Sequence, residues 1–308
     1  MIKIEKFNKD IIWFTNLIDE CFSIKVKNKQ GLVKWKFFNN INNSKNKIIC
    51  WYDGNKIISQ YSNIYFNFIK NKKTIDWYLC QDMCVSKKYR GQWLISEMFK
   101  KLYSEIEEKT LTIWFSNSSW VKVDKNSNWY WYNIIDNLVN YYFSSVIFKK
   151  WYSFEKIENS ANLENIDFSK FNFFEDKLQI NKTKEFIKWR YFNDSDYNFY
   201  VFKFNDEIIG YWVFKHTKTI STLFDFNCIK NIDEKKLVNT FKNISFKNYN
   251  LIFRIIILEN NFWKKLFVWF FKISKNTQIY FTIKKHNNFD KLNVLDREEW
   301  KIMWGDVL

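Results

Sequence analysis

Short runs of alternating apolar and polar residues alternate with segments whose apolar positions recur at the helical period. In the first half, this pattern predicts helices over residues 9–22, 32–39 and 93–108. It predicts strands over residues 47–52, 56–68, 75–85 and 111–115, then a second helical stretch and aromatic strands near residues 141–154. Asp53-Gly54 lies between the first two strands and indicates a hairpin turn. This mixture of strands and helices predicts an α/β fold.

A repeated segment divides the chain into two units. WKFFNN at residues 35–40 recurs as WRYFND at residues 189–194, and each copy precedes a strand pair with two adjacent isoleucines. The second half predicts strands over residues 200–204, 207–215, 219–227 and 251–258, and helices over residues 234–243 and 261–270. We therefore expect domains at residues 1–155 and 164–308, joined by a linker over residues 153–163, with chance similarity in a biased sequence as the alternative.

The composition excludes several classes of protein. Of the 308 residues, 47% are hydrophobic and 21% aromatic, which is too much apolar material for a disordered chain. No apolar run reaches the roughly 18 residues of a membrane span, and the first residues lack the pattern of a signal peptide, so we expect a cytoplasmic protein. The net charge of +16 comes from lysines interspersed with Asp, Glu and Asn, so a nucleic-acid partner is not favoured. Five scattered cysteines and two histidines, with no Cys-x-x-Cys, disfavour disulfides and a metal site.

One loop has the composition of an anion-binding site. Lys87, Lys88, Arg90 and Gly91 lie between a strand that ends at Val85 and a helix that begins near residue 93. Backbone amides at a helix N-terminus, beside a glycine and basic side chains, suit a pyrophosphate. The loop has neither the Walker nor the Rossmann pattern, and an ordinary basic turn is the alternative.

The loop residues Arg90-Gly91-Gln92-Trp93-Leu94-Ile95 resemble the acyl-CoA loop of the GNAT acyltransferases, which reads Arg/Gln-x-x-Gly-x-Gly/Ala. The WKFFNN element, the hairpin, the phrase QDMCV and the region IWFSNSSWVKVDKNSNWYWY are similar to the subgroup with tandem GNAT domains. The resemblance implies two GNAT-like domains, each a mixed, mostly antiparallel twisted sheet flanked by helices. It implies transfer of an acetyl group from acetyl-CoA to a small-molecule amine, with an amino sugar as one acceptor, and no metal.

The resemblance also assigns roles to individual residues. The loop amides of residues 90–95 hold the pyrophosphate, and the backbone of Met83, Cys84 and Val85 pairs with pantetheine. Asp82 is a candidate general base, with a structural role as the alternative. Asn117 is a candidate for binding substrate or water, or else a strand terminator. The tyrosine that protonates the thiolate in many family members is replaced by Ser127, so we expect Tyr130 or Tyr132 to take this role, with core aromatics as the alternative.

The loop departs from the family pattern at Trp93, where the family has glycine, and at Ile95, where it has a small residue. Tryptophan also stands at other expected glycine positions, and the chain has 16 Trp but only 5 Gly, against about 22 expected. One hypothesis is that UGA codons read as glycine were translated as Trp, at positions Trp93, Trp114, Trp120, Trp129, Trp131, Trp269 and Trp304. The other is that Trp93 is genuine and blocks the loop, which would make the chain a catalytically inactive binding or scaffold protein.

The second unit has no counterpart of this loop. Its third predicted strand is followed by CIKNIDEKKL at residues 228–237, which lacks Arg-Gly and adds acidic residues. We therefore expect residues 164–308 to form a degenerate GNAT-like domain that helps to form the acceptor cleft.

Overall fold

A computed structural model describes residues 2–7, 11–106, 110–117, 133–144, 152–193, 196–248, 252–258, 272–285 and 300–301. The elements of the first unit are β1 (Ile2–Lys6), α1 (Ile11–Phe22), α2 (Lys29–Val33), a π-helical turn (Lys34–Phe38), β2 (Lys47–Asp53), β3 (Lys56–Lys70), β4 (Lys73–Val85), α3 (Leu94–Tyr103), β5 (Leu111–Asn117) and β6 (Asn133–Ser144).

The second unit repeats this order. Its elements are β7 (Ser153–Ile157), β8 (Gln179–Ile180), α5 (Lys184–Tyr191), β9 (Tyr197–Phe204), β10 (Glu207–His216), β11 (Ile220–Cys228), α6 (Glu234–Lys247), β12 (Ile252–Leu258) and β13 (Lys272–Lys285). β7 lies in the segment predicted to be a linker, so that prediction was wrong. Its side chains alternate only weakly between buried and exposed positions, so its sequence pattern did not indicate a strand. The helix predicted for residues 261–270 lies outside the described residues.

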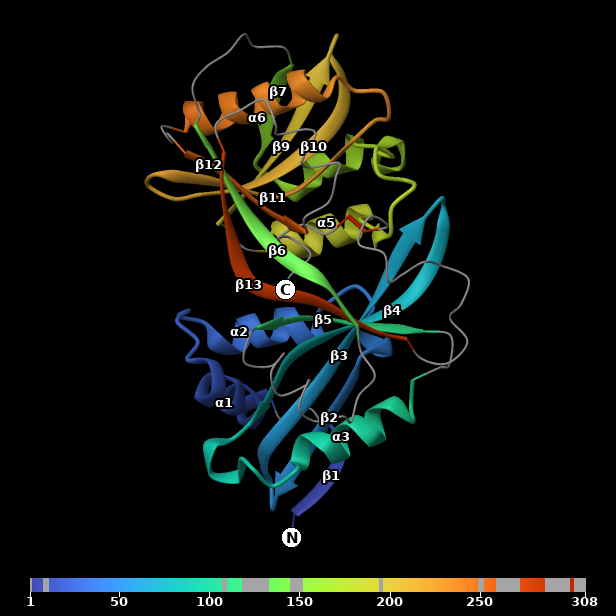
Figure 1. The fold of residues 1–308 in the computed structure, drawn as a ribbon, viewed down its shortest axis with the longest axis vertical. Helices are drawn as coiled ribbons and strands as arrows, with labels where there is room; N and C mark the ends of the chain where they lie inside the picture. Colours follow the sequence, from blue (N-terminus) through green and yellow to red (C-terminus); the bar gives the residue numbers. More distant parts are fainter. Residues whose placement is uncertain are drawn as a thin grey trace.

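The strands of both units form one continuous sheet in the described part of the chain, in the order β1-β2-β3-β4-β5-β13-β6-β12-β11-β10-β9-β7, with β8 paired to β3 (Figure 1). The pairings β4–β5 and β11–β12 are parallel and the other strand pairings are antiparallel. β13, from the second half, lies between β5 and β6, and β6, from the first half, pairs with β12. Each unit therefore receives a strand from the other half of the chain.

The repeated tryptophans meet where the two units pack together. Trp35 and Trp189 stack with their ring centroids 5.4 Å apart. The indole N–H of Trp35 donates to the carbonyl of Trp189 at 2.9 Å, and the indole N–H of Trp189 donates to the carbonyl of Trp35 at 3.2 Å. Because equivalent residues make reciprocal contacts, the two units are related by a local two-fold arrangement.

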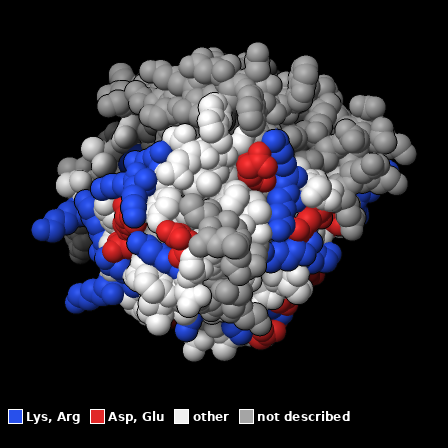
Figure 2. All heavy atoms as spheres, turned by 90° about the horizontal axis from the view of Figure 1, so that it is seen from below, with Lys and Arg blue, Asp and Glu red and all other residues white. Residues whose placement is uncertain are grey.

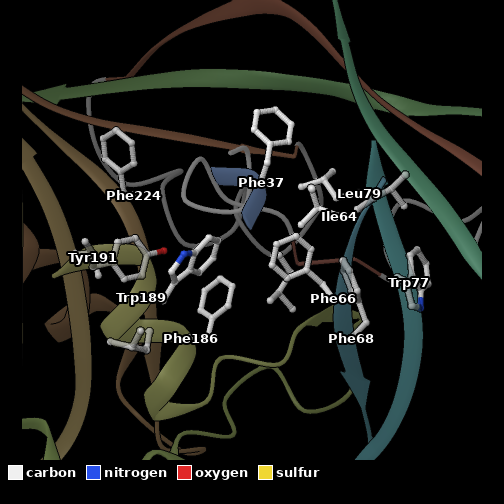
Figure 3. Packing of buried hydrophobic residues seen from close by; sticks show 14 of the residues in the cluster. Phe37, Ile64, Phe66, Phe68, Trp77, Leu79, Phe186, Trp189, Tyr191 and Phe224 are labelled. Carbon is white, nitrogen blue, oxygen red and sulfur yellow. The ribbon is translucent and has the colours of Figure 1, made fainter. Parts of the chain in front are cut away.

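The largest hydrophobic cluster is shared by both units. Phe66, Phe68 and Trp77 of the first unit pack in the same cluster as Phe186 and Trp189 of the second (Figure 3). Trp300 also packs in this cluster, with its ring centroid 4.8 Å from that of Trp77. Two smaller clusters lie under α3 and under α6. Because the interface between the units is itself a core, we expect them to unfold together.

Candidate functional site

The described strands β4 and β5 separate in the middle of the first unit. They pair in parallel only from Trp77 to Leu79 on β4 and from Leu111 to Ile113 on β5. β4 continues for six more residues to Val85, whereas β5 continues beside β13 to Asn117. Among the described residues, no strand therefore pairs with Met83, Cys84 and Val85 on the side of β5, although the Val85 carbonyl accepts from the Cys21 thiol and the Arg90 guanidinium. A ligand with amide groups could pair with this free edge, as in β-strand addition.

A bulge in β4 lies just before this free edge. The register between β3 and β4 shifts between Gln60 and Ser62, which sets Asp82 and Met83 opposite Tyr61 and gives β4 one extra residue. Asp82 has φ of 45°, a left-handed conformation that Asp tolerates better than most residues. The side-chain amide nitrogen of Gln60 donates to the backbone carbonyl of Asp82 and stabilises the bulge. A bulge changes the direction in which side chains point, and this one places Asp82 next to the point where β4 and β5 separate.

Asp82 forms an ion pair with Lys36 of the π-helical turn, at 2.6 Å. The Lys36 side chain is 12% exposed and the Asp82 side chain 29% exposed, so the carboxylate is reachable from solvent while its partner is largely covered. The preceding residue, Gln81, is buried, and its side-chain oxygen has no hydrogen-bond partner among the described residues. Lys36 follows Trp35, so the pair lies next to the interface with the second unit. The structure thus gives Asp82 a charged partner that the sequence did not indicate.

The loop after β4 is fastened at several points. The backbone N–H of Ser86 donates to the carbonyl of Ile58 at 2.8 Å. One carboxylate oxygen of Glu20 accepts from the Ser86 hydroxyl at 2.9 Å and from the Lys87 backbone N–H at 2.8 Å. These bonds, above all the one from Lys87, hold the pKa of Glu20 below its usual range. The loop is thus preorganised without a ligand.

The turn between this fastening and α3 faces solvent. Arg90, Gly91 and Gln92 are exposed, and the Arg90 guanidinium donates to the Val85 carbonyl at 3.2 Å. Gly91 has φ of 80°, with open space where a side chain would project. α3 begins at Leu94, and Leu94 is buried while Ile95 is half-buried. The first N–H groups of a helix commonly have no partner within it, so those of Leu94 and Ile95 are candidates to donate to an anion near Gly91, whereas the Ser96 N–H already donates to the Trp93 carbonyl at 3.0 Å.

Trp93 is the N-cap residue of α3, with φ of 59° and ψ of 11°. This left-handed conformation favours glycine and is rare for an aromatic residue. The indole is 71% exposed, the highest value among the large hydrophobic residues that the structure describes as exposed. The backbone at residue 93 therefore has the geometry that a glycine would adopt.

The remaining sequence-predicted residues are only partly placed. Asn117 ends β5 opposite Ile279 of β13. Trp114 lies on β5 and packs against the cluster under α3. Tyr130, Tyr132, Trp120, Trp129, Trp131, Trp269 and Trp304 lie outside the described residues. Trp35, Trp189 and Trp300 have packed aromatic environments, as structural tryptophans require.

The second unit has an aspartate at the position of Asp82 but a different environment. Asp225 lies three residues before the end of β11, as Asp82 does in β4, and is fully buried. Lys182 contacts it at 2.5 Å and Lys301 at 3.6 Å, while Tyr191 donates to it at 3.1 Å. After β11, α6 begins with Asp233 as its N-cap, which would repel a phosphate. This site is therefore structural, and the first unit carries the accessible loop.

Two further features were not found among the described residues. No group of three or more His, Cys, Asp or Glu side chains there could hold a metal ion. No helix in the described part is long and apolar enough to cross a membrane.

Neither a family model nor a curated protein matches the sequence significantly, but solved structures match its fold. A probable N-acyltransferase from Enterococcus faecalis has a TM-score of 0.69 at 12% identity, covering 93% of this chain and 73% of that chain. A GCN5-related N-acetyltransferase from Anabaena variabilis has a TM-score of 0.66 at 12% identity, with the same coverages of 93% and 73%. N-myristoyltransferase from Saccharomyces cerevisiae, solved with bound myristoyl-CoA, has a TM-score of 0.58 at 10% identity, covering 100% of this chain and 89% of that chain. The chain therefore has the fold of the GCN5-related N-acetyltransferases, in the form of two GNAT-like units.

Proposed function

We propose that the chain is an N-acyltransferase that takes an acetyl group from acetyl-CoA and transfers it to a small-molecule amine. One observation carries the proposal: the free edge of β4 leads directly into the fastened loop that holds Arg90 and Gly91 at the start of α3. The first unit, which ends with β6, binds the donor, and the second GNAT-like unit, which begins with β7, lies beside the acceptor. We also propose a cytoplasmic location, because the first residues lack the pattern of a signal peptide.

The donor side is supported by the chemistry of the loop. Gly91 leaves room for phosphate oxygens, and Lys87, Lys88 and Arg90 supply positive charge. The donors we propose for the pyrophosphate are backbone amides of residues 91–95, because the Arg90 N–H already donates to the Lys87 carbonyl at 3.5 Å. The backbone of Met83, Cys84 and Val85 offers hydrogen bonds to the pantetheine amides. Positioning of this kind supplies most of the rate in such a reaction, because it converts an encounter between two substrates into a reaction within one complex.

The acceptor side is supported by Asp82. An ammonium group must lose a proton before it attacks a thioester, and a partly exposed carboxylate at the strand separation can accept that proton. Lys36 fixes the orientation of the carboxylate at 2.6 Å. Trp189 of the second unit stacks on the neighbouring Trp35, so the second unit forms one side of this region. An amino sugar is the acceptor we propose first, and Asn117 is proposed to contact it from the end of β5.

Trp93 supports a second candidate function. If this residue is genuine, its bulk at the helix start hinders the approach of a pyrophosphate, and the chain would be an inactive GNAT-like binding protein. A nucleic-acid binder would need one continuous basic face with exposed aromatics. The face of Figure 2 instead shows Lys and Arg side chains in separate groups with Asp and Glu between them.

Release of free CoA thiol from acetyl-CoA tests the proposal, with amino sugars, amino acids and polyamines as separate acceptors. Residue 93 should be tested both as Trp and as Gly. Asp82→Asn is expected to lower kcat by roughly 100-fold or more, because it removes the proton acceptor. Asp76→Asn is the matched control, since Asp76 is exposed on the same strand at the far end from the loop. Absence of amine-dependent thiol release with either residue at position 93 would support the binding-protein alternative.

A further inference from the structure

Two thiols meet at the base of the donor loop. Cys21 lies in the last turn of α1, and Cys84 is the residue before the end of β4. The Cys21 thiol donates to the carbonyl of Val85, the residue after Cys84, at 3.5 Å, and each of the two thiols shifts the pKa of the other. They are 63 residues apart in sequence, so only the packing of α1 on β4 brings them together.

The two thiols have different environments. The hydrogen bond from Cys84 lowers the pKa of Cys21, Arg90 lowers it further, and burial and Glu20 oppose this effect. Burial raises the pKa of Cys84 well above its usual value. Cys21 is half-buried, whereas Cys84 is buried. Cys21 therefore has the properties of an attacking thiolate, and Cys84 those of a resolving thiol.

The other three cysteines have different surroundings. Cys50 and Cys228 are completely buried, and burial raises the pKa of the Cys50 thiol. Cys80 is half-buried on β4 and interacts with the hydroxyl of Tyr61. They serve as internal controls for the pair.

We infer that Cys21 and Cys84 form an oxidation site that closes to a disulfide in the presence of a peroxide. The Cys21 thiolate attacks one oxygen of hydrogen peroxide, which gives a Cys21 sulfenic acid and hydroxide. The Cys84 sulfur then attacks the Cys21 sulfur and displaces the hydroxyl group, which leaves as water with the Cys84 proton. In sum, two thiols and one peroxide give one disulfide and two waters.

The disulfide acts on the donor loop. A disulfide requires Cβ atoms about 3.8 Å apart, so closure ties the end of β4 to the last turn of α1. Glu20, beside Cys21, already holds Ser86 and Lys87, and Arg90 interacts with the Cys21 thiol. Oxidation removes that thiol partner and draws Cys84 away from the free edge of β4. This effect on donor binding rests on the proposed function, whereas disulfide formation does not.

The experiment treats the reduced full chain with hydrogen peroxide and then blocks the remaining thiols with an alkylating reagent. Peptide mapping by mass spectrometry is expected to show a Cys21–Cys84 crosslink, with Cys50, Cys80 and Cys228 alkylated after unfolding. Cys21→Ser is expected to abolish the crosslink, and Cys80→Ser is expected to leave it unchanged. A sulfinic or sulfonic acid at Cys21 without a crosslink, or a crosslink between other cysteines, would overturn the inference.

A titration with acetyl-CoA then tests the consequence. The oxidised chain is expected to bind at least about 5-fold more weakly than the reduced chain, and Cys21→Ser is expected to bind equally before and after peroxide. Equal binding by the oxidised and reduced chains would refute the coupling to the loop. If neither form binds acetyl-CoA while the crosslink forms, the oxidation site stands and the proposed function fails.

Discussion

Replacement of Trp93 by glycine tests the loop most severely. Trp93 holds φ of 59° at the N-cap of α3, and its indole is 71% exposed. A left-handed conformation costs a residue other than glycine about 1–2 kcal/mol, so Trp93→Gly relieves that strain. Two effects oppose this relief. Glycine loses more conformational entropy on folding, which costs about 0.5–1 kcal/mol, and the substitution removes the contacts made by the covered part of the indole.

The size of the lost contact follows from the exposure. A tryptophan buries up to about 250 Å² when fully covered, so Trp93 has about 70 Å² in contact, worth about 2 kcal/mol at 25 cal/mol per Å². When the relieved strain is subtracted from the two losses, the free energy of unfolding is expected to fall by about 0.5–2 kcal/mol. Trp13→Gly is the matched control because Trp13 lies in α1 and is 37% exposed. It is expected to cost about 4 kcal/mol from lost burial and helix propensity.

Urea denaturation of the two variants measures these changes. If Trp93→Gly destabilises the chain as much as Trp13→Gly does, position 93 does not favour glycine and the reasoning fails. The same variant is expected to bind acetyl-CoA at least about 10-fold more tightly, which is 1.4 kcal/mol, because the backbone can approach a pyrophosphate more closely. Unchanged or weaker affinity would remove the support that this position gives to the enzyme.

Three further substitutions have expected outcomes. Glu20→Gln keeps the shape but weakens the bonds to Ser86 and Lys87, so acetyl-CoA affinity measured by calorimetry is expected to fall about 3- to 10-fold, and an unchanged affinity would count against loop preorganisation. Asp225→Asn removes the buried carboxylate that pairs with Lys182 and Lys301 and is expected to cost about 3–5 kcal/mol by urea unfolding, with a loss below about 1 kcal/mol as the contradicting result. Burial lowers the pKa of His216 from 6.5 to about 4, so the folded chain binds fewer protons than the unfolded chain and loses stability as pH falls from 6.5 to about 4. His216→Gln is expected to flatten this loss by about 1–2 kcal/mol, and identical pH profiles for both chains would refute the assignment.

Much of the fold was predictable because its signals are local. The Asp53-Gly54 turn and the alternating strands on either side of it fix the first hairpin, and the observed strands end within two residues of the predicted ends. The repeat at Trp35 and Trp189 correctly indicated two similar units. The resemblance through Arg90 and Gly91 also led to the correct fold.

Contacts between distant segments were not predictable in this way. No strand was predicted over β13, and its sequence pattern does not indicate that it lies between β5 and β6. Lys36 lies in the repeated segment, yet its ion pair with Asp82 depends on the bulge, which has no turn residue such as glycine to mark it. Glu20 and Cys21 looked like ordinary helical residues, because their roles depend on how α1 packs against β4. Their clearest signal was position: both lie at the end of α1.

Amide hydrogen exchange of the Trp93→Gly chain, with and without saturating acetyl-CoA, tests most directly whether the first unit binds an acyl donor. The account predicts slower exchange at residues 83–96, where the free edge of β4, the loop and the start of α3 would contact the donor, and no change at the equivalent residues 226–236 of the second unit. Unchanged exchange at residues 83–96, or protection confined to the second unit, would contradict it.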